Sequence, residues 1–473
     1  MSSLTVEEIG RPALAGAVPA APPTRRSLFA SRRARRQRLF AAVPDSAYDD
    51  PIQITQGLFG RFAMVNDPAG VRRVLVENVA NYPKTPLQQR FFTAIFGAGL
   101  LGSDGELWRA HRRIMAPSFD PRSVAAYGPA VTEATTALLA RWDAKGPGAI
   151  TDMVTEMTDV TLRIIAKTMF STDDDEVLDA INRSLHGGQD VISDINMLDL
   201  LPLTREWRMR RREARVTRLF ASVDALVARL MAEREADPAS APDDLLTRLI
   251  AARDEVGGGR LSPRDVRDEV VTIFMAGHET TAMTMSWVWY LLSQHPREFA
   301  RLGEELDAVL AGRPAGQADL PRLAFTRRVV EESMRLYPAA PGISTRVALE
   351  DDVISGQKIP KGMSIAILPW VLHRHRKLWD DPERFDPDRF LPERSAGRPR
   401  FAFLPFGAGP RVCIGQVLAM NETVLILANL AQAYQPRLAP DARVALHAAI
   451  TLRPKHGLKM LLERRVAGGE GRL

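Results

Sequence analysis

The stretch FGAGPRVCIG, residues 406–415, contains the only cysteine of the 473-residue chain. Glycines at positions 407, 409 and 415 permit a tight loop whose backbone N–H groups can approach a sulfur atom closely. A helix is predicted from about residue 414 to residue 432, and the positive end of its dipole favours a thiolate. The stretch therefore predicts that Cys413 is held in a cradle of backbone donors.

Several chemical roles are open to a single thiol. By default a lone cysteine is a small buried hydrophobic residue. No Cys–His arrangement in the sequence supports a nucleophile, and without a second cysteine the usual zinc ligand set is incomplete. A lone thiolate among N–H donors suits the axial ligand of a haem iron, where it favours O–O cleavage. Arg411 would then be placed to pair with a haem propionate.

Composition narrows the class of protein. The chain is 45% hydrophobic and 25% charged, which is typical of a globular protein. A single cysteine allows no intrachain disulfide, which suits the cytoplasm. The formal net charge of +6 comes mostly from arginines spread over the chain, and no nucleic-acid-binding motif accompanies it. No apolar run is long enough to span a membrane, so we expect no transmembrane anchor.

The pattern along the chain predicts a mostly helical protein with a small strand-rich lobe. Residues 1–45 are rich in Ala, Pro and Arg, which predicts a mobile tail. Residues 46–473 are predicted to form a single domain. Residues 52–65 read as two strands around a glycine turn. Residues 262–296 begin with a Ser cap and Pro and are too apolar for a surface helix, so they should cross the core. Short strands and coil are expected from Pro338 to about residue 412.

The cysteine stretch resembles the signature F-x-x-G-x-R-x-C-x-G of the cytochromes P-450, the haem-thiolate monooxygenases. Phe406, Gly409, Arg411, Cys413 and Gly415 meet it in full, and three further motifs follow the family's order over roughly residues 46–460. The resemblance implies a mainly α fold with a small β-rich lobe, in which haem b lies between the long central helix and the cysteine loop. It implies that Cys413 is the axial ligand of the haem iron.

The segment AGHETT (276–281) resembles the family's oxygen-activation motif. Polar Glu279 and Thr280 within an apolar helix are costly unless they have a function. The resemblance implies that Gly277 and Thr280 open the helix above the iron, and that Thr280 and Glu279 relay protons to bound oxygen. The alternative is local: a Thr hydroxyl bonded back to its own helix bends that helix.

Two other motifs concern arginines. EESMRLYP (331–338) resembles the E-x-x-R motif, in which Glu332 and Arg335 share a helix face and Arg389 of PDRF (387–390) completes a network that folds the thiolate loop. The alternative is a surface pair worth little. Trp108 and Arg112 of WRAHRR, Arg346 and Arg411 match the family's propionate contacts. Taken singly, each arginine is best interpreted as a surface residue. Together they would form a positively charged binding site for a dianionic cofactor.

The wider sequence is similar to the bacterial fatty-acid-hydroxylating branch of the family and its microsomal-type relatives. This similarity implies an apolar substrate cavity lined by Leu101, Ala276, Ala340, Gly342, Ile343, Ile450 and Thr451. Arg61 matches the arginine that anchors fatty-acid carboxylates in that branch, but its usual tyrosine companion is Val65 here. Fatty acids, terpenoids and similar lipophilic compounds therefore remain open.

The resemblance implies a monooxygenase that inserts one atom of O₂ into a lipophilic substrate. Electrons would come from a separate ferredoxin or flavodoxin with its reductase, which would dock on a basic face that includes Arg109, Arg113 and Arg411. Two alternatives remain. A peroxide-dependent peroxygenase or isomerase is disfavoured by the intact Glu279–Thr280 pair. A non-catalytic haem sensor is disfavoured because no signalling segment is attached.

Overall fold

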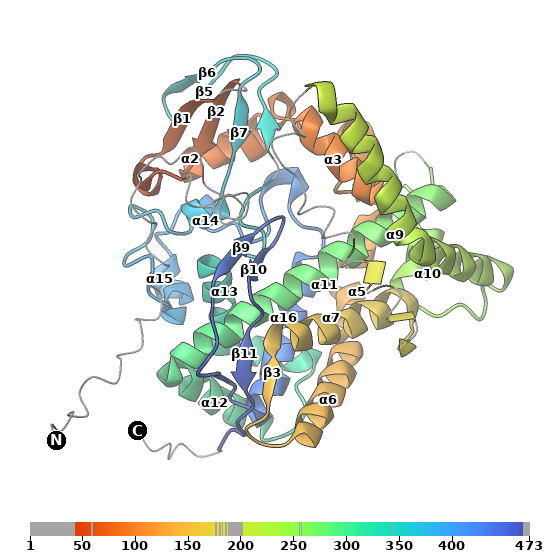
Figure 1. The fold of residues 1–473 in the computed structure, drawn as a ribbon, viewed down its shortest axis with the longest axis vertical. Helices are drawn as coiled ribbons and strands as arrows, with labels where there is room; N and C mark the ends of the chain where they lie inside the picture. Colours follow the sequence, from red (N-terminus) through yellow and green to blue (C-terminus); the bar gives the residue numbers. More distant parts are fainter. Residues whose placement is uncertain are drawn as a thin grey trace.

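The computed structural model describes residues 43–466, apart from 58–59, 176, 179–180, 182, 185–186, 188–201, 255, 257 and 344. The predicted tail over residues 1–45 lies almost entirely outside this range. The fold is dominated by helices, as the sequence predicts (Figure 1). The α-helices are α2 (Pro68–Arg72), α3 (Pro86–Phe96), α4 (Gly105–Met115), α5 (Pro121–Ala125), α6 (Gly128–Lys145), α7 (Met153–Phe170), α9 (Pro202–Ala236), α10 (Leu245–Ala251), α11 (Pro263–Gln294), α12 (Pro296–Leu310), α13 (Ala324–Leu336), α14 (Pro369–Leu372), α15 (Pro392–Ser395) and α16 (Gln416–Ala433).

The long helix α11 crosses the centre of the molecule, as expected for residues 262–296. It begins with a reciprocal cap: the Asp265 N–H donates to the Ser262 hydroxyl over 3.2 Å, and the Ser262 N–H donates to the Asp265 carboxylate over 3.1 Å. Helices α7, α13 and α16 pack against it (Figure 1). Residues of α11 belong to both of the larger buried hydrophobic clusters, so this helix joins the two. None of the described helices has the length and apolar character needed to cross a bilayer.

The strand-rich lobe lies at one end of the molecule, at the top of Figure 1. The predicted strands over 52–65 are β1 (Ile52–Gly57) and β2 (Gly60–Val65), an antiparallel pair in which Ile52 lies opposite Val65. β2 continues the sheet through a parallel pairing with β7 (Ser364–Ala366), which pairs in turn with β4 (Arg346–Val347). β5 (Asp352–Ile354) and β6 (Gln357–Ile359) form a separate hairpin.

The remaining strands were not predicted because each is only two or three residues long. β3 (Ile150–Asp152), β11 (Lys459–Leu461) and β8 (Arg437–Leu438) form a sheet with β11 in the centre. β9 (Leu446–Ala448) and β10 (Leu452–Pro454) form a hairpin. Short turns of 3₁₀ or π helix complete the fold: η2 (Asp45–Tyr48), η3 (Arg73–Glu77), η4 (Val79–Asn81), η5 (Ala116–Phe119), η7 (Gln317–Arg322), η8 (Pro387–Phe390), η9 (Arg400–Ala402) and η10 (Gly409–Arg411).

Candidate active site

The cysteine loop is a closed turn between η10 and α16. The Cys413 N–H donates to the carbonyl oxygen of Phe406 over 2.9 Å. Gly409 has φ +71°, and a Cβ atom at this position would lie 1.9 Å from the carbonyl oxygen of Leu75. Only glycine fits such a left-handed, closely packed position. The glycine of the motif therefore lets the loop pass against η3.

Two opposing effects act on the pKa of the Cys413 thiol. Burial raises the pKa of the Cys413 thiol, while the Gly415 amide and the Arg112 guanidinium lower it without overcoming the effect of burial. Yet the cysteine is an exposed residue by accessible surface. The two observations agree if the thiol faces a hollow inside the protein. A coordinated metal ion would supply the positive charge that the thiolate needs.

One face of α11 opens in the middle of the helix. From Asp268 to Trp289 every residue is buried except Ala276, Gly277 and Thr280. Residues spaced in this way lie on one face of a helix, and Ala276 and Thr280 are partly accessible there. A Cβ atom at Gly277 would lie 3.2 Å from Cδ1 of Ile165, so Gly277 faces α7. The Thr280 hydroxyl donates to the carbonyl oxygen of Ala276 over 2.7 Å. The bond within the helix that the sequence offered as an alternative is therefore present, at the point where α11 opens.

Glu279 is held by residues far away in the sequence. Its Oε1 atom accepts from the Thr451 hydroxyl over 2.5 Å and from Nε of Arg453 over 3.0 Å. The sequence placed Thr451 in the wall of the substrate cavity. In the structure Thr451 is only 4% exposed, and its hydroxyl is committed to Glu279.

A cluster of buried cations lies beside α4. Arg346 is 5% exposed, and its buried Nε atom has no hydrogen-bond partner among the described residues. Lys84 and Arg411 act electrostatically on one another, and burial lowers the pKa of Lys84 to about 7. Asp104 accepts from the Lys84 N–H over 3.1 Å and also pairs with Arg411. Arg346, Lys84 and Arg411 are thus buried together near a single carboxylate, Asp104, which pairs only with Arg411 among them. Such an excess of buried positive charge suits an anion, and haem propionates fit this requirement.

Trp108 and Arg112 lie on one face of α4, as predicted. The guanidinium carbon of Arg411 sits 4.1 Å from the centre of the Trp108 ring, a cation–π contact. Arg112 lies close enough to Cys413 to interact with it electrostatically. The four residues matched to propionate contacts therefore lie around the cysteine loop and the cation cluster.

The network around Glu332 is fully buried. Arg335 donates two hydrogen bonds, of 2.6 and 2.8 Å, to the Glu332 carboxylate, and both side chains are 0% exposed. Nε of Arg389 lies 3.3 Å from the same carboxylate, as the PDRF match predicts. Arg335 also donates to the carbonyl oxygens of residues 373, 382 and 384. The alternative of a surface pair is excluded for Glu332 and Arg335.

His373 connects this network to the cysteine loop, and the sequence analysis missed it. Its carbonyl oxygen accepts from Arg335, while its ring Nε2 accepts from the Leu404 N–H over 2.8 Å. Burial lowers the pKa of His373 to about 3, so the ring is neutral and can accept. The only sequence signal was a histidine in the apolar segment ILPWVLHRH, which does not show that the ring meets Leu404.

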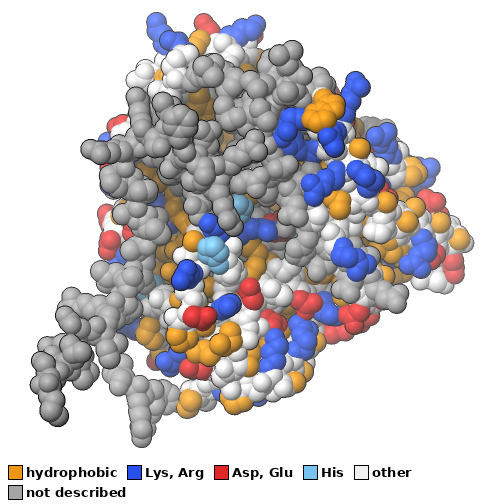
Figure 2. Space-filling view, viewed as in Figure 1, with side chains coloured by type: hydrophobic (Ala, Val, Ile, Leu, Met, Phe, Trp, Pro, Cys, Tyr) orange, Lys and Arg blue, Asp and Glu red, His pale blue; other side chains and the backbone are white. Residues whose placement is uncertain are grey.

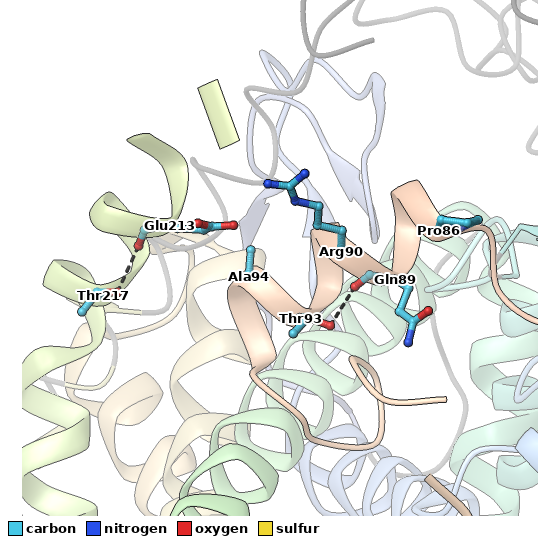
Figure 3. A pocket seen from close by; sticks show the side chains of 7 residues that line it. All are labelled: Pro86, Gln89, Arg90, Thr93, Ala94, Glu213 and Thr217. Carbon is cyan, nitrogen blue, oxygen red and sulfur yellow. Dashed lines mark hydrogen bonds between the residues drawn. The ribbon is translucent and has the colours of Figure 1, made fainter. Parts of the chain in front are cut away.

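The residues expected to line the substrate cavity differ in exposure. Leu101, Ala276, Ala340, Gly342 and Ile343 are partly exposed, whereas Ile450 is 37% exposed. A separate open groove of about 540 Å³ lies between α3 and α9. Figure 3 shows Arg90 and Glu213 pointing into it, and its lining includes none of the predicted cavity residues. The groove is therefore distinct from the predicted site.

The basic face expected to receive an electron donor is weaker than predicted. Arg109 and Arg113 are accessible, but they pair with Glu106 and Asp254. The Arg411 side chain is only 13% exposed because Asp104 and Trp108 hold it, so its inclusion in an exposed docking face was wrong. Figure 2 shows another basic surface, over α9, whose exposed arginines are Arg210, Arg211, Arg215 and Arg218.

Comparison with known proteins agrees with this geometry. The family model "Cytochrome P450" matches residues 50–459. Pentalenene oxygenase of Streptomyces avermitilis is 35% identical, over 79% of this chain and 82% of its own. Cyclooctat-9-en-7-ol 5-monooxygenase of Streptomyces melanosporofaciens is 35% identical, over 91% of both chains. The crystal structure of the cytochrome P450DA heme domain superposes with a TM-score of 0.76 at 28% identity, over 88% of this chain and 90% of that one.

The chain belongs to the cytochrome P450 family. It is an oxidoreductase of the monooxygenase type, with a haem-thiolate cofactor whose iron has a cysteine ligand. Such an enzyme uses O₂, a lipophilic substrate and an external electron donor. The structure has the fold that the sequence predicts, mainly α with a small β-rich lobe.

Proposed function

We propose that this enzyme oxygenates a terpenoid or similar uncharged lipophilic substrate, with electrons from a separate ferredoxin or flavodoxin and its reductase. The observation that carries the proposal is the partly exposed strip of α11, where small Ala276 and the Thr280 side chain are accessible on an otherwise buried helix. The names of related enzymes, Pentalenene oxygenase and Cyclooctat-9-en-7-ol 5-monooxygenase, support a terpenoid.

The substrate class is supported by the surroundings of Arg61, where the described residues build no carboxylate anchor. This arginine is exposed on β2, and its Nε donates to the Gln56 side chain over 3.3 Å. Val65, where the fatty-acid branch has a tyrosine, is 0% exposed and packs in the core of the lobe. An exposed arginine without a second donor binds a carboxylate weakly in water. Small or apolar Leu101, Ala276, Ala340, Gly342, Ile343 and Ile450 would surround the substrate.

The residue roles follow from the cluster geometry. Cys413, the only cysteine, is assigned as the iron ligand, within a loop shaped by Phe406, Gly409 and Gly415. Trp108, Arg112, Arg346 and Arg411 would hold the propionates. When bound, the haem supplies the activation of O₂ that thiolate ligation favours. Thr280 and Glu279 would move protons towards the accessible strip of α11 that includes Thr280.

Two further proposals concern the setting of the enzyme. Residues 46–473 would form one domain, which is supported by the way α11 joins the two larger hydrophobic clusters. A cytoplasmic location would suit a protein with a single cysteine.

An electron donor would have to approach the Cys413 side of the molecule, where Arg109 and Arg113 are exposed.

The test is oxygenation with labelled O₂. The haem-loaded enzyme, a bacterial ferredoxin, its reductase and NADPH are incubated with ¹⁸O₂ and either pentalenene or palmitic acid. We expect one ¹⁸O atom in a terpenoid product and little palmitate oxidation. Comparable palmitate hydroxylation would contradict the substrate class. Turnover with hydrogen peroxide but not with O₂ and the electron donor would contradict the proposed electron route.

A further inference from the structure

The carboxylate of Glu279 is held on one side only. All three donors that reach it, the Thr451 hydroxyl, Nε of Arg453 and Nη2 of Arg453, contact the same oxygen, Oε1. In the described part of the chain no donor lies within hydrogen-bond distance of Oε2. One oxygen is thus fixed, and the other accepts no hydrogen bond from a described residue.

The backbone around β10 explains how two side chains reach one oxygen atom. In an extended chain, side chains two residues apart point to the same face. Thr451 and Arg453 are related in this way, and Leu452 between them is 0% exposed in the core. The pair therefore approaches α11 as a unit, with a short hydroxyl and a long guanidinium directed at the same carboxylate.

The strand that presents Arg453 is anchored on both sides. The Trp287 indole N–H donates to the Leu452 carbonyl oxygen over 2.9 Å, which ties β10 to α11. The Leu452 N–H donates to the Ala339 carbonyl oxygen, also over 2.9 Å. Because β10 cannot shift easily, Arg453 holds Glu279 relative to Thr280, the next residue of α11.

We propose that Arg453 is a positioning residue for proton delivery: with Thr451 it fixes Glu279 through Oε1 and keeps Oε2 for proton exchange near Thr280. The proposal rests on the proposed monooxygenase mechanism. In a variant without Arg453 the Glu279 carboxylate can rotate. Electrons then still reach oxygen, but protons do not arrive in time for oxygen insertion. Reduced oxygen is then released as hydrogen peroxide instead of being inserted into the substrate.

The first test measures the interaction between Arg453 and Glu279 without enzyme turnover. Thermal unfolding of the haem-loaded protein is measured for Arg453→Ala, Glu279→Gln and the double variant. Residues that interact directly give non-additive effects, so the double variant should lose little beyond the larger single loss. The matched control is Arg437→Ala, which removes an exposed arginine 2.7 Å from Glu463, combined with Glu279→Gln. Its effect should add to that of Glu279→Gln.

The second test measures product formed per pair of electrons. In Arg453→Ala this ratio should fall roughly tenfold. This loss is smaller than the 10²–10⁴ loss in rate that is typical when the proton-transfer group itself is removed. The KM for the substrate should be unchanged. Arg453→Lys should recover part of the loss. Turnover driven by hydrogen peroxide should fall much less, because peroxide already carries the two electrons and two protons that O₂ must acquire.

The outcomes distinguish a failure of the Arg453 proposal from a failure of the proposed function. Additive unfolding effects for Arg453→Ala and Glu279→Gln, or an unchanged product ratio in Arg453→Ala, would overturn the role of Arg453. An equal loss of peroxide-driven turnover would also overturn it, since the defect would not then lie in proton delivery. If wild-type enzyme forms no product with any electron donor, the proposed function fails, while the unfolding cycle still decides whether Arg453 holds Glu279.

Discussion

The ammonium nitrogen of Lys84 donates to the carbonyl oxygen of Leu101 over 2.6 Å. It also donates to the carbonyl oxygen of Ser103 over 3.0 Å, so a buried cation fixes the loop that carries Leu101. This loop borders the predicted substrate cavity, and its shape therefore depends on a side chain outside it.

Lys84→Met should loosen this loop. Methionine keeps most of the apolar stem but leaves the Leu101 carbonyl without its donor, at a cost of about 1–3 kcal/mol. Urea unfolding should show this loss, and amide hydrogen exchange of residues 99–103 should quicken. Lys361→Met, at an exposed lysine, is the control and should leave both unchanged. Unaltered exchange in Lys84→Met would mean that the loop holds its shape without the ammonium group.

Thr280→Ala should separate oxygen reduction from product formation. The hydroxyl borders the opening of α11, and removal of a proton-transfer group typically costs 10²–10⁴ in rate. Haem content and substrate binding should remain near wild type. Thr281→Ala is a matched control, because its hydroxyl also bonds back along α11, over 3.0 Å to Gly277, but is buried on another face. Equal effects in both variants would assign Thr280 to helix geometry alone.

Glu332→Ala should destabilise the haem-loaded protein although Glu332 is remote from the cofactor in our assignment. Removal of the carboxylate leaves Arg335 and Arg389 buried without their anion, which typically costs about 3–5 kcal/mol. We expect low haem occupancy after purification and a lower unfolding temperature. Glu331→Ala removes the neighbouring carboxylate, which pairs with exposed Arg327 over 3.2 Å, and should change little. Normal haem occupancy in Glu332→Ala would contradict the proposed support of the cysteine loop.

Glu422→Gln should change how stability depends on pH. Burial raises the pKa of Glu422 on α16 from 4.5 to about 8, and no described residue forms a hydrogen bond or ion pair with its carboxyl group. Between these two values the folded state binds more protons than the unfolded state, so stability falls as pH rises. Glutamine cannot ionise. The variant should match wild type near pH 5 and exceed it by roughly 3–5 kcal/mol at pH 9.

Thermal unfolding across this pH range, as the difference between variant and wild type, isolates Glu422 from other titrating groups. A constant difference from pH 5 to pH 9 would show that the carboxyl group ionises freely in the folded protein.

The sequence predicted those parts of the fold and site that depend on local spacing. The helix start at Ser262, the strands over 52–65 and the Glu332–Arg335 pair all rest on residues a few positions apart. Contacts between distant segments were predicted only where the family motifs imply them, as for Arg389 and Glu332, and the other distant contacts were not predicted. Arg453 meets Glu279 across 174 residues, and His373 meets Leu404 across 31. Thr451 was placed in the cavity wall by its match to the family's motifs, and only the fold shows that its hydroxyl donates to Glu279.

The central position of β11 affects how the chain can fold as it is synthesised. Strands β3 and β8 do not pair with each other, and each pairs instead with residues 459–461. While the ribosome makes α7 to α16, residues 150–152 therefore lack their partner. The nascent chain must keep that edge available until Met460 emerges, so this sheet can be completed only after α7 to α16 have been synthesised.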